Sequence, residues 1–130
     1  MQPNAQNAGS GIDTAAEAEA LLNRVRDSLE DDKAENISVI DLAGKTTLAD
    51  YMVIASGRSS RQVAAIAEHL VERVKAAGQP VLGVEGMRTA EWVAIDLGDV
   101  LVHVFQPEVR SFYNLEKLWS VTWPEQAAAL

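Results

Sequence analysis

The spacing of apolar residues predicts two amphipathic helices in the first part of the chain. We expect the first to begin near Asp13 or Thr14, which are both good helix caps, and to carry apolar residues three or four positions apart. These residues are Ala18, Leu21, Leu22, Val25 and Leu29. The acidic residues of the same helix are expected to form a solvated face.

The second helix is expected to start after Ser59, because a serine followed three residues later by Gln62 is typical of a capping box. Gly78 is a natural helix stop, and Pro80 supports an end at that point. The residues that this helix would bury are Val63, Ile66, Ala67, Leu70, Val71 and Val74.

Short apolar stretches around the second helix predict the strands. Residues 50–57 form an almost unbroken apolar run, which suits a central strand covered on both faces. A last helix is expected from Pro107 to about Leu118. The remaining strands are expected at 36–42, 81–84, 91–96 and 100–105. This order predicts an α/β domain with a mixed five-stranded sheet and flanking helices.

The last two expected strands are close enough in sequence to form a hairpin. A two-residue turn at Leu97 and Gly98 would place Trp92 opposite His103. Side chains alternate along each strand, so one face of the hairpin is aliphatic and is expected to lie in the core. Its members are Val93, Ile95, Val100, Val102 and Val104. The other face is half polar and carries Trp92, Asp96, Asp99 and His103 with three apolar residues.

Trp92 on the half-polar face has two interpretations. A helix could cover its ring, as happens to most Trp side chains on strands, or the ring could be an exposed anchor for a partner. Asp96 and Asp99 are likewise either ordinary turn residues or acidic contacts beside that anchor.

Composition and charge limit the classes of partner that the chain is expected to bind. The chain has 130 residues, which predicts one domain, and 11 Lys and Arg against 19 Asp and Glu, a net charge of −8. This acidity argues against unassisted nucleic-acid binding and against an anionic membrane surface. It favours a basic or neutral partner. Cys is absent and only two His occur, so we expect no metal site and no cofactor.

The ends of the chain give expectations about location and domain boundaries. No stretch approaches the roughly 18–20 apolar residues of a membrane helix, and the N-terminus lacks the basic start and apolar run of a signal peptide. A cytoplasmic protein is therefore expected. We expect residues 1–12 to be a disordered tail, 13–120 the domain and 121–130 a short tail.

Residues 57–61 are the one segment that suggests enzymatic chemistry. They carry two Arg between a strand and a helix start, where backbone N–H groups could hold a phosphate. Helix capping by Ser59 or Ser60 explains the same residues more simply. A nucleotidyltransferase would also need paired carboxylates for a divalent metal, and no Asp-x-Asp occurs. We expect no catalytic residues, with a nucleotide- or phosphate-binding, nucleotidyltransferase-like enzyme as the alternative.

Three sequence blocks carry a resemblance to a known family. They are Gly-Val-Glu-Gly at 83–86, Asp-Leu-Gly-Asp at 96–99 and Leu-Glu-Lys-Leu-Trp at 115–119, and they are specific in combination. Together with the order of the other segments, over about residues 15–120, they resemble the bacterial ribosomal silencing factor family RsfS, also called Iojap-like.

The resemblance implies a fold like that of nucleotidyltransferases without their catalytic carboxylates. It also implies a translational repressor that binds the large ribosomal subunit through the large-subunit ribosomal protein L fourteen and obstructs docking of the small subunit. Some members pair as homodimers, and a large-subunit assembly factor is a further alternative. No DNA and no membrane partner is expected. The expected partner-binding residues are Trp92, Asp96, Leu97, Gly98, Asp99, Glu85, Gly86, Met87 and His103.

Overall fold

The computed structural model describes residues 10–109, with side chains from residue 15 onward. Two helices and five strands make up this part of the chain. They are α2 (Ser10–Asp31), β1 (Glu35–Asp41), β2 (Tyr51–Ser56), α3 (Ser60–Ala76), β3 (Gly83–Glu85), β4 (Trp92–Asp96) and β5 (Val100–Phe105). Residues 107–109 are helical and begin the predicted last helix. The rest of that predicted helix lies outside the described residues, as do residues 1–9 and 121–130.

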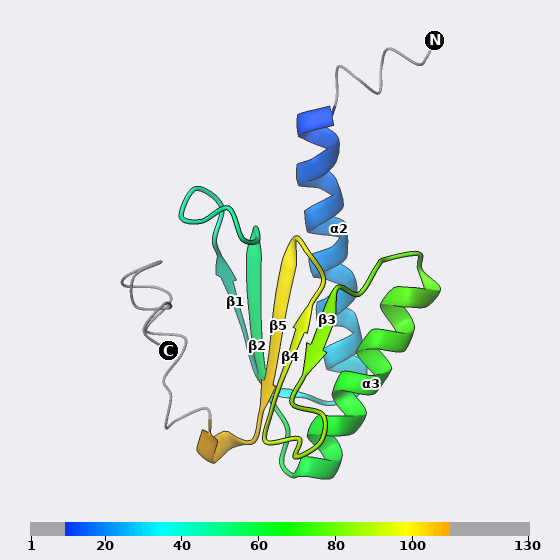
Figure 1. Cartoon of the computed structure of the whole chain (residues 1–130), viewed down its shortest axis with the longest axis vertical. Helices are drawn as coiled ribbons and strands as arrows, with labels where there is room; N and C mark the ends of the chain where they lie inside the picture. Colours follow the sequence, from blue (N-terminus) through cyan, green and yellow to red (C-terminus); the bar gives the residue numbers. More distant parts are fainter. Residues whose placement is uncertain (1–9, 110–130) are drawn as a thin grey trace.

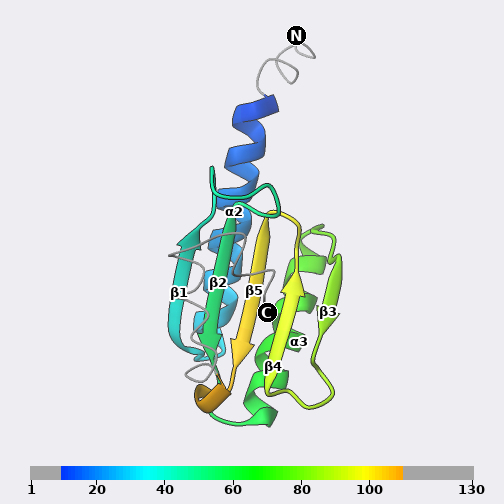
Figure 2. The ribbon, with the colours of Figure 1, turned by 60° about the vertical axis from the view of Figure 1, so that its left-hand side comes forward.

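The five strands form one mixed sheet in the order β1-β2-β5-β4-β3. β2 and β5 are parallel, and the other three neighbouring pairs are antiparallel. The predicted α/β class with a mixed five-stranded sheet is therefore confirmed. Figures 1 and 2 show that α2 and α3 both lie on one side of the sheet. On the opposite side, Val109 of the helical residues 107–109 packs against a buried apolar cluster.

β2 lies inside the sheet between β1 and β5, as its apolar run predicts. Val53 and Ala55 belong to the core beneath the two helices. Met52 and Ile54 point to the opposite face, where a second buried cluster also contains Leu42, Ala49 and Phe105. Alternate residues of a strand point to opposite faces, so a strand buried on both sides must be apolar throughout.

α3 begins where its capping pattern predicts. Ser59 Oγ accepts a hydrogen bond from the backbone N–H of Gln62 at 3.1 Å, and Gln62 Oε1 accepts one from the N–H of Arg58 at 2.6 Å. Five of the six predicted apolar residues of this helix are buried, and Val71 is half-buried. Gly78 has φ of +89°, a conformation that favours glycine and ends the helical run. α2 starts at Ser10, three residues before the predicted Asp13.

A polar network joins the two helices near the end of α2. The Asp32 carboxylate accepts from both terminal nitrogens of Arg73, at 3.1 and 3.2 Å, and lies 3.0 Å from Nδ1 of His69. Arg73 also donates to the carbonyl and the hydroxyl of the buried Ser28. These contacts fix α2 against α3 and give the acidic residue Asp32 a structural role.

The hairpin of β4 and β5 turns one residue later than the sequence predicts, at Gly98 and Asp99 rather than at Leu97 and Gly98. The structure pairs Trp92 with Phe105 and Asp96 with Leu101, so the predicted pairing of Trp92 with His103 is wrong by two residues. Leu97 N–H donates to the Val100 carbonyl across the turn at 3.0 Å. An even shift leaves the strand side chains on their predicted faces, and the five aliphatic residues predicted for the core are buried. Asp99 in the turn differs from the prediction, because it lines a cavity with residues of α2 on the helix side of the sheet.

Candidate functional site

Trp92 begins β4 on the sheet face that neither described helix covers. Its indole N–H donates a hydrogen bond to Nδ1 of His103 at 2.9 Å, and its ring lies 4.9 Å from the ring of Phe105, measured between centroids. The side chain is half-buried and packs against the second apolar cluster. The ring of Trp92 therefore packs on the sheet, neither α2 nor α3 covers it, and part of its surface stays accessible.

His103 lies next to Ile54 of β2 and Ala94 of β4 in the middle of this face. Burial lowers its pKa from 6.5 to about 4, because a charged imidazolium would lose its hydration there. Nδ1 accepts the Trp92 N–H, so the ring proton of the neutral imidazole must sit on Nε2. The pair is thus uncharged at neutral pH and fixes the orientation of the Trp92 ring.

Gly86 and Glu85 lie at the same end of the sheet as Trp92. Gly86 has φ of +93°, and a Cβ at this position would overlap the carbonyl oxygen of Trp92. Only glycine allows the loop to approach the Trp92 backbone this closely. Glu85 pairs with Ala94, so its exposed carboxylate is on the same face as Trp92. These residues form what we call the tryptophan end: Trp92, His103, Glu85 and Gly86.

The Asp-Leu-Gly-Asp turn lies at the other end of β4, about 13 Å away for four residues of extended strand. Asp96 Oδ1 accepts the N–H of Gly98 at 2.9 Å, which closes the turn. The Asp99 carbonyl accepts the N–H groups of Asp50 and Tyr51, at 2.8 and 3.1 Å. The predicted partner-binding residues therefore form two separate groups, at opposite ends of one strand.

Two of the predicted contact residues lie on the helix side of the sheet, away from the Trp92 ring. Leu97 is only 1% exposed, so its side chain supports the turn and is not presented to a partner. Met87 is half-buried and packs against the cluster beneath the helices, on the opposite side of the sheet from the Trp92 ring. Both are apolar residues between polar neighbours, and only the path of the turns decides which way they point.

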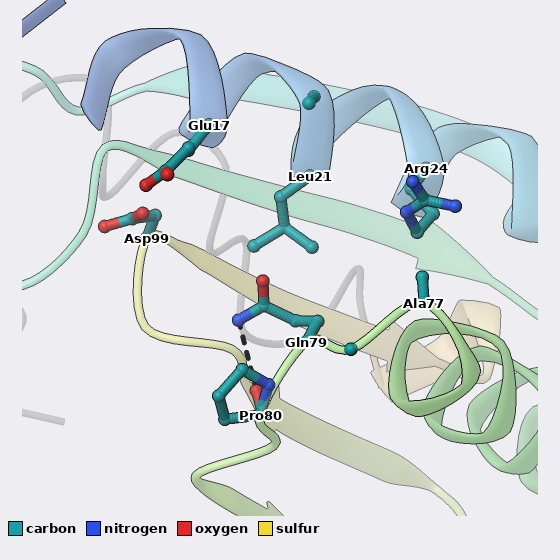
Figure 3. A pocket seen from close by; sticks show the side chains of 9 residues that line it. Glu17, Leu21, Arg24, Ala77, Gln79, Pro80 and Asp99 are labelled. Atoms are coloured by element: carbon teal, nitrogen blue, oxygen red, sulfur yellow. Dashed lines mark hydrogen bonds between the residues drawn. The ribbon is translucent and has the colours of Figure 1, made fainter. Parts of the chain in front are cut away.

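A cavity of about 460 Å³ joins the Asp-Leu-Gly-Asp turn to the first helix, and the sequence did not predict it. In Figure 3 the carboxylates of Glu17 and Asp99 point toward each other at one end, and Arg24 lies near the other. Gln79 fixes one wall by donating to the carbonyls of Leu97 and Pro80, at 3.0 and 3.2 Å. The acidic face of α2 therefore continues into the turn, where it would attract a basic partner.

The segment 57–61 has the geometry of a cap. The N–H groups of Arg58 and Gln62 are engaged by the capping side chains, and the Arg58 guanidinium donates to Glu35 at 2.6 Å. Some of the N–H and guanidinium groups that would bind a phosphate therefore already form hydrogen bonds within this chain. Within residues 10–109, no cluster of three or more His, Asp or Glu residues is arranged to hold a metal ion. None of the described helices is long and apolar enough to cross a membrane.

Comparison with known proteins identifies the family. Residues 15–129 match the family model described as ribosomal silencing factor during starvation. The ribosomal silencing factor RsfS of Zymomonas mobilis is 58% identical over 106 residues, covering 82% of this chain and 80% of that protein. A mouse protein named mitochondrial assembly of ribosomal large subunit protein 1 is 34% identical over 96 residues, covering 72% of this chain and 42% of that protein.

The fold agrees with the sequence comparison. A crystal structure of a Chromobacterium violaceum protein superposes with a TM-score of 0.77 at 39% identity, covering 82% of this chain and 88% of that one. Sequence, fold and the order of the motifs point to the same group. The chain therefore belongs to the ribosomal silencing factor family.

Proposed function

We propose that this protein represses translation by binding the large ribosomal subunit through ribosomal protein L fourteen and blocking the small subunit sterically. The observation that carries the proposal is the position of Trp92 in a chain of this family. Its ring is half-buried and held in place by His103, on the sheet face opposite α2 and α3. A rigid, partly exposed aromatic ring is the kind of side chain that dominates binding interfaces. We place this activity in the cytoplasm.

The proposed contact has an apolar centre and an acidic surround. Trp92 supplies the buried area, and Glu85 lies on the same face beside it. Asp96 and Asp99 extend the acidic surface at the far end of β4. The net charge of −8 matches a basic ribosomal protein, because opposite potentials accelerate encounter. Leu97 and Met87 are left out of the proposed contact because their side chains pack inward.

Steric occlusion needs no catalytic turnover. When a protein occupies the docking surface, the small subunit can join only after displacing it. The free energy of that displacement is added to the free energy of subunit joining. At a concentration 100-fold above its Kd, this cost is about 2.7 kcal/mol, which reduces the joined fraction substantially. We accordingly propose that the chain has no nucleotidyltransferase activity, which would require metal-holding carboxylates.

Sedimentation with isolated ribosomal subunits tests the proposed partner. The protein should pellet with large subunits and remain in the supernatant with small ones. Excess isolated L fourteen should then release it from the large subunits. Equal pelleting with both subunits would contradict the proposal, and binding to large subunits that L fourteen does not displace would place the contact elsewhere.

A role in large-subunit assembly is the second candidate. The mouse relative is named for mitochondrial assembly of the large ribosomal subunit, and it shares 34% identity with this chain. The two roles differ in the particle that is bound. An assembly factor would bind immature large subunits and leave mature ones, whereas a silencing factor must bind mature subunits. Comparing the two kinds of particle in the same sedimentation experiment separates the candidates.

A further inference from the structure

β3 leaves an unpaired strand edge at the border of the sheet. It pairs with β4 on one side, and no strand within residues 10–109 pairs with its other side. Figures 1 and 2 both show β3 at the edge of the sheet, running beside α3. An open edge offers backbone N–H and C=O groups that another extended segment can use. The edge is also apolar, because Leu82 is 66% exposed and Val84 36% exposed.

A groove between this edge and α3 could receive a side chain. Its cavity of about 240 Å³ is lined by Ala67, Glu68, Val71, Glu72, Val84 and Met87. The apolar members come from both walls, so an aliphatic side chain that enters the groove would contact α3 and β3 together. The groove is on the helix side of the sheet, whereas the Trp92 ring is on the opposite side.

The acidic charge beside the groove favours a basic occupant over an acidic one. Glu68 and Glu72 are one helical turn apart on the groove wall, both are exposed, and neither forms an ion pair with another described residue. Glu85 at the end of β3 is on the opposite face, beside Trp92, and does not line the groove. A second copy of the chain pairing through β3 would bring two such acidic walls together and be repelled.

We propose that an extended basic segment of a partner polypeptide adds to β3 as a sixth strand. One of its aliphatic side chains enters the groove, and its lysine or arginine side chains meet Glu68 and Glu72. Apolar and basic residues two positions apart would satisfy both requirements, because every second side chain of a strand points to the same face and the groove and the two glutamates both lie on the helix side. The surface is separate from the proposed Trp92 contact and can be tested without ribosomes.

The probe is a synthetic peptide in which valine and lysine take turns at every second position, with threonine between them, so that both kinds of side chain lie on one face of the strand. Titration into the isotope-labelled full chain should shift the backbone amide signals of 82–87 and of the α3 residues at the groove, with weak, saturable binding. The same peptide with alternate backbone amides N-methylated should not bind, because it cannot form the strand ladder. Glu68→Lys with Glu72→Lys should weaken binding about tenfold or more.

Asp27→Lys with Asp31→Lys is the matched control. It makes the same charge change at the same helical spacing on α2, at two exposed positions away from the groove. The control should weaken binding much less than the groove variant. Equal loss in both variants, equal binding of the N-methylated peptide, shifts centred elsewhere, or no binding at about 1 mM peptide would each overturn the proposal. Self-association through β3 in sedimentation equilibrium would also overturn it, by assigning the edge to a second copy.

Discussion

Trp92 contributes both to packing and to the proposed binding surface. Replacing it with Ala removes the ring contact with Phe105 and the hydrogen bond to His103. We expect Trp92→Ala to lower the affinity for the large subunit about 30-fold, which corresponds to about 2 kcal/mol. The free energy of unfolding should fall by less than for Ile54→Ala in the same cluster, where about 2–5 kcal/mol is expected.

Titration calorimetry with large subunits and urea unfolding of each variant measure these two effects. Leu48→Ala is a control, because Leu48 is 63% exposed in a loop outside the proposed contact and should bind as the parent does. If Trp92→Ala unfolds as readily as Ile54→Ala, the ring is a core residue. If it is stable and binds normally, the interface lies elsewhere.

His103 makes stability depend on pH. Its folded pKa of about 4 is below the unfolded value of 6.5, so the unfolded chain takes up a proton first as the pH falls. The stabilisation is complete above pH 6.5 and is lost progressively toward pH 4. Between pH 6.5 and pH 5 the free energy of unfolding should decrease by about 1–2 kcal/mol. Urea unfolding at several pH values measures this slope, and His103→Gln should flatten it. An unchanged slope in that variant would assign the pH dependence to other groups.

Gly86 tests how closely the loop must approach Trp92. Gly86→Ala should cost more than Gly44→Ala, although both glycines have positive φ. Nothing lies within 4 Å of a Cβ at Gly44, so only the backbone strain of about 1–2 kcal/mol applies there. At Gly86 the added methyl group would also overlap the Trp92 carbonyl oxygen. Equal losses in urea unfolding would mean that the loop can move away from Trp92 at no cost.

At the scale of elements, we expect Asp99 in the turn between β4 and β5 to affect association through its charge more than it affects stability through packing. Asp99 lines the cavity opposite Glu17, and the two carboxylates repel each other (Figure 3). Asp99→Asn should therefore leave the free energy of unfolding unchanged or slightly higher. It should slow association with large subunits about threefold at low salt, with a smaller effect at high salt.

Stopped-flow association rates measure the effect of Asp99→Asn, and Asp27→Asn is its control. Asp27 is exposed on α2, and its replacement removes the same charge away from the turn. An equal slowing by both variants would show that net charge alone controls association. A faster off-rate for Asp99→Asn would place its carboxylate inside the contact.

The elements themselves could largely be predicted from periodicity. α3 combines a capping serine, a regular apolar stripe and a terminal glycine, so local and tertiary preferences agree along its length. The hairpin register could not be predicted, because pairings that differ by two residues leave the same side chains buried. The position of the turn depends on backbone hydrogen bonds of Leu97 and Gly98, which the apolar pattern does not reveal.

The candidate site was predicted less completely than the fold. Trp92 and His103 were identified because strand alternation places them on the half-polar face. Glu85 was expected only from the resemblance of the Gly-Val-Glu-Gly block. The division of the site into two ends of β4 needed the register, and the cavity beside Glu17 needed the packing of α2 against the turn. Distances between segments remote in sequence are set by tertiary structure, which periodicity does not contain.

At the scale of the whole molecule, the two sides of the sheet have different roles. Both described helices pack on one side and form the larger core, while the other side carries Trp92 and His103. In the proposed function, this division lets a single small domain fold around one face and use the other for the partner. The acidic surface favours encounter with a basic partner and disfavours binding to bare RNA.

Subunit joining followed by light scattering tests the central claim most directly. Large subunits are incubated with increasing amounts of the protein before small subunits are added, and the joined fraction is measured. We predict that joining falls as the large subunits saturate, and that Trp92→Ala needs about 30-fold more protein for the same effect. Undiminished joining on fully saturated large subunits would contradict steric occlusion.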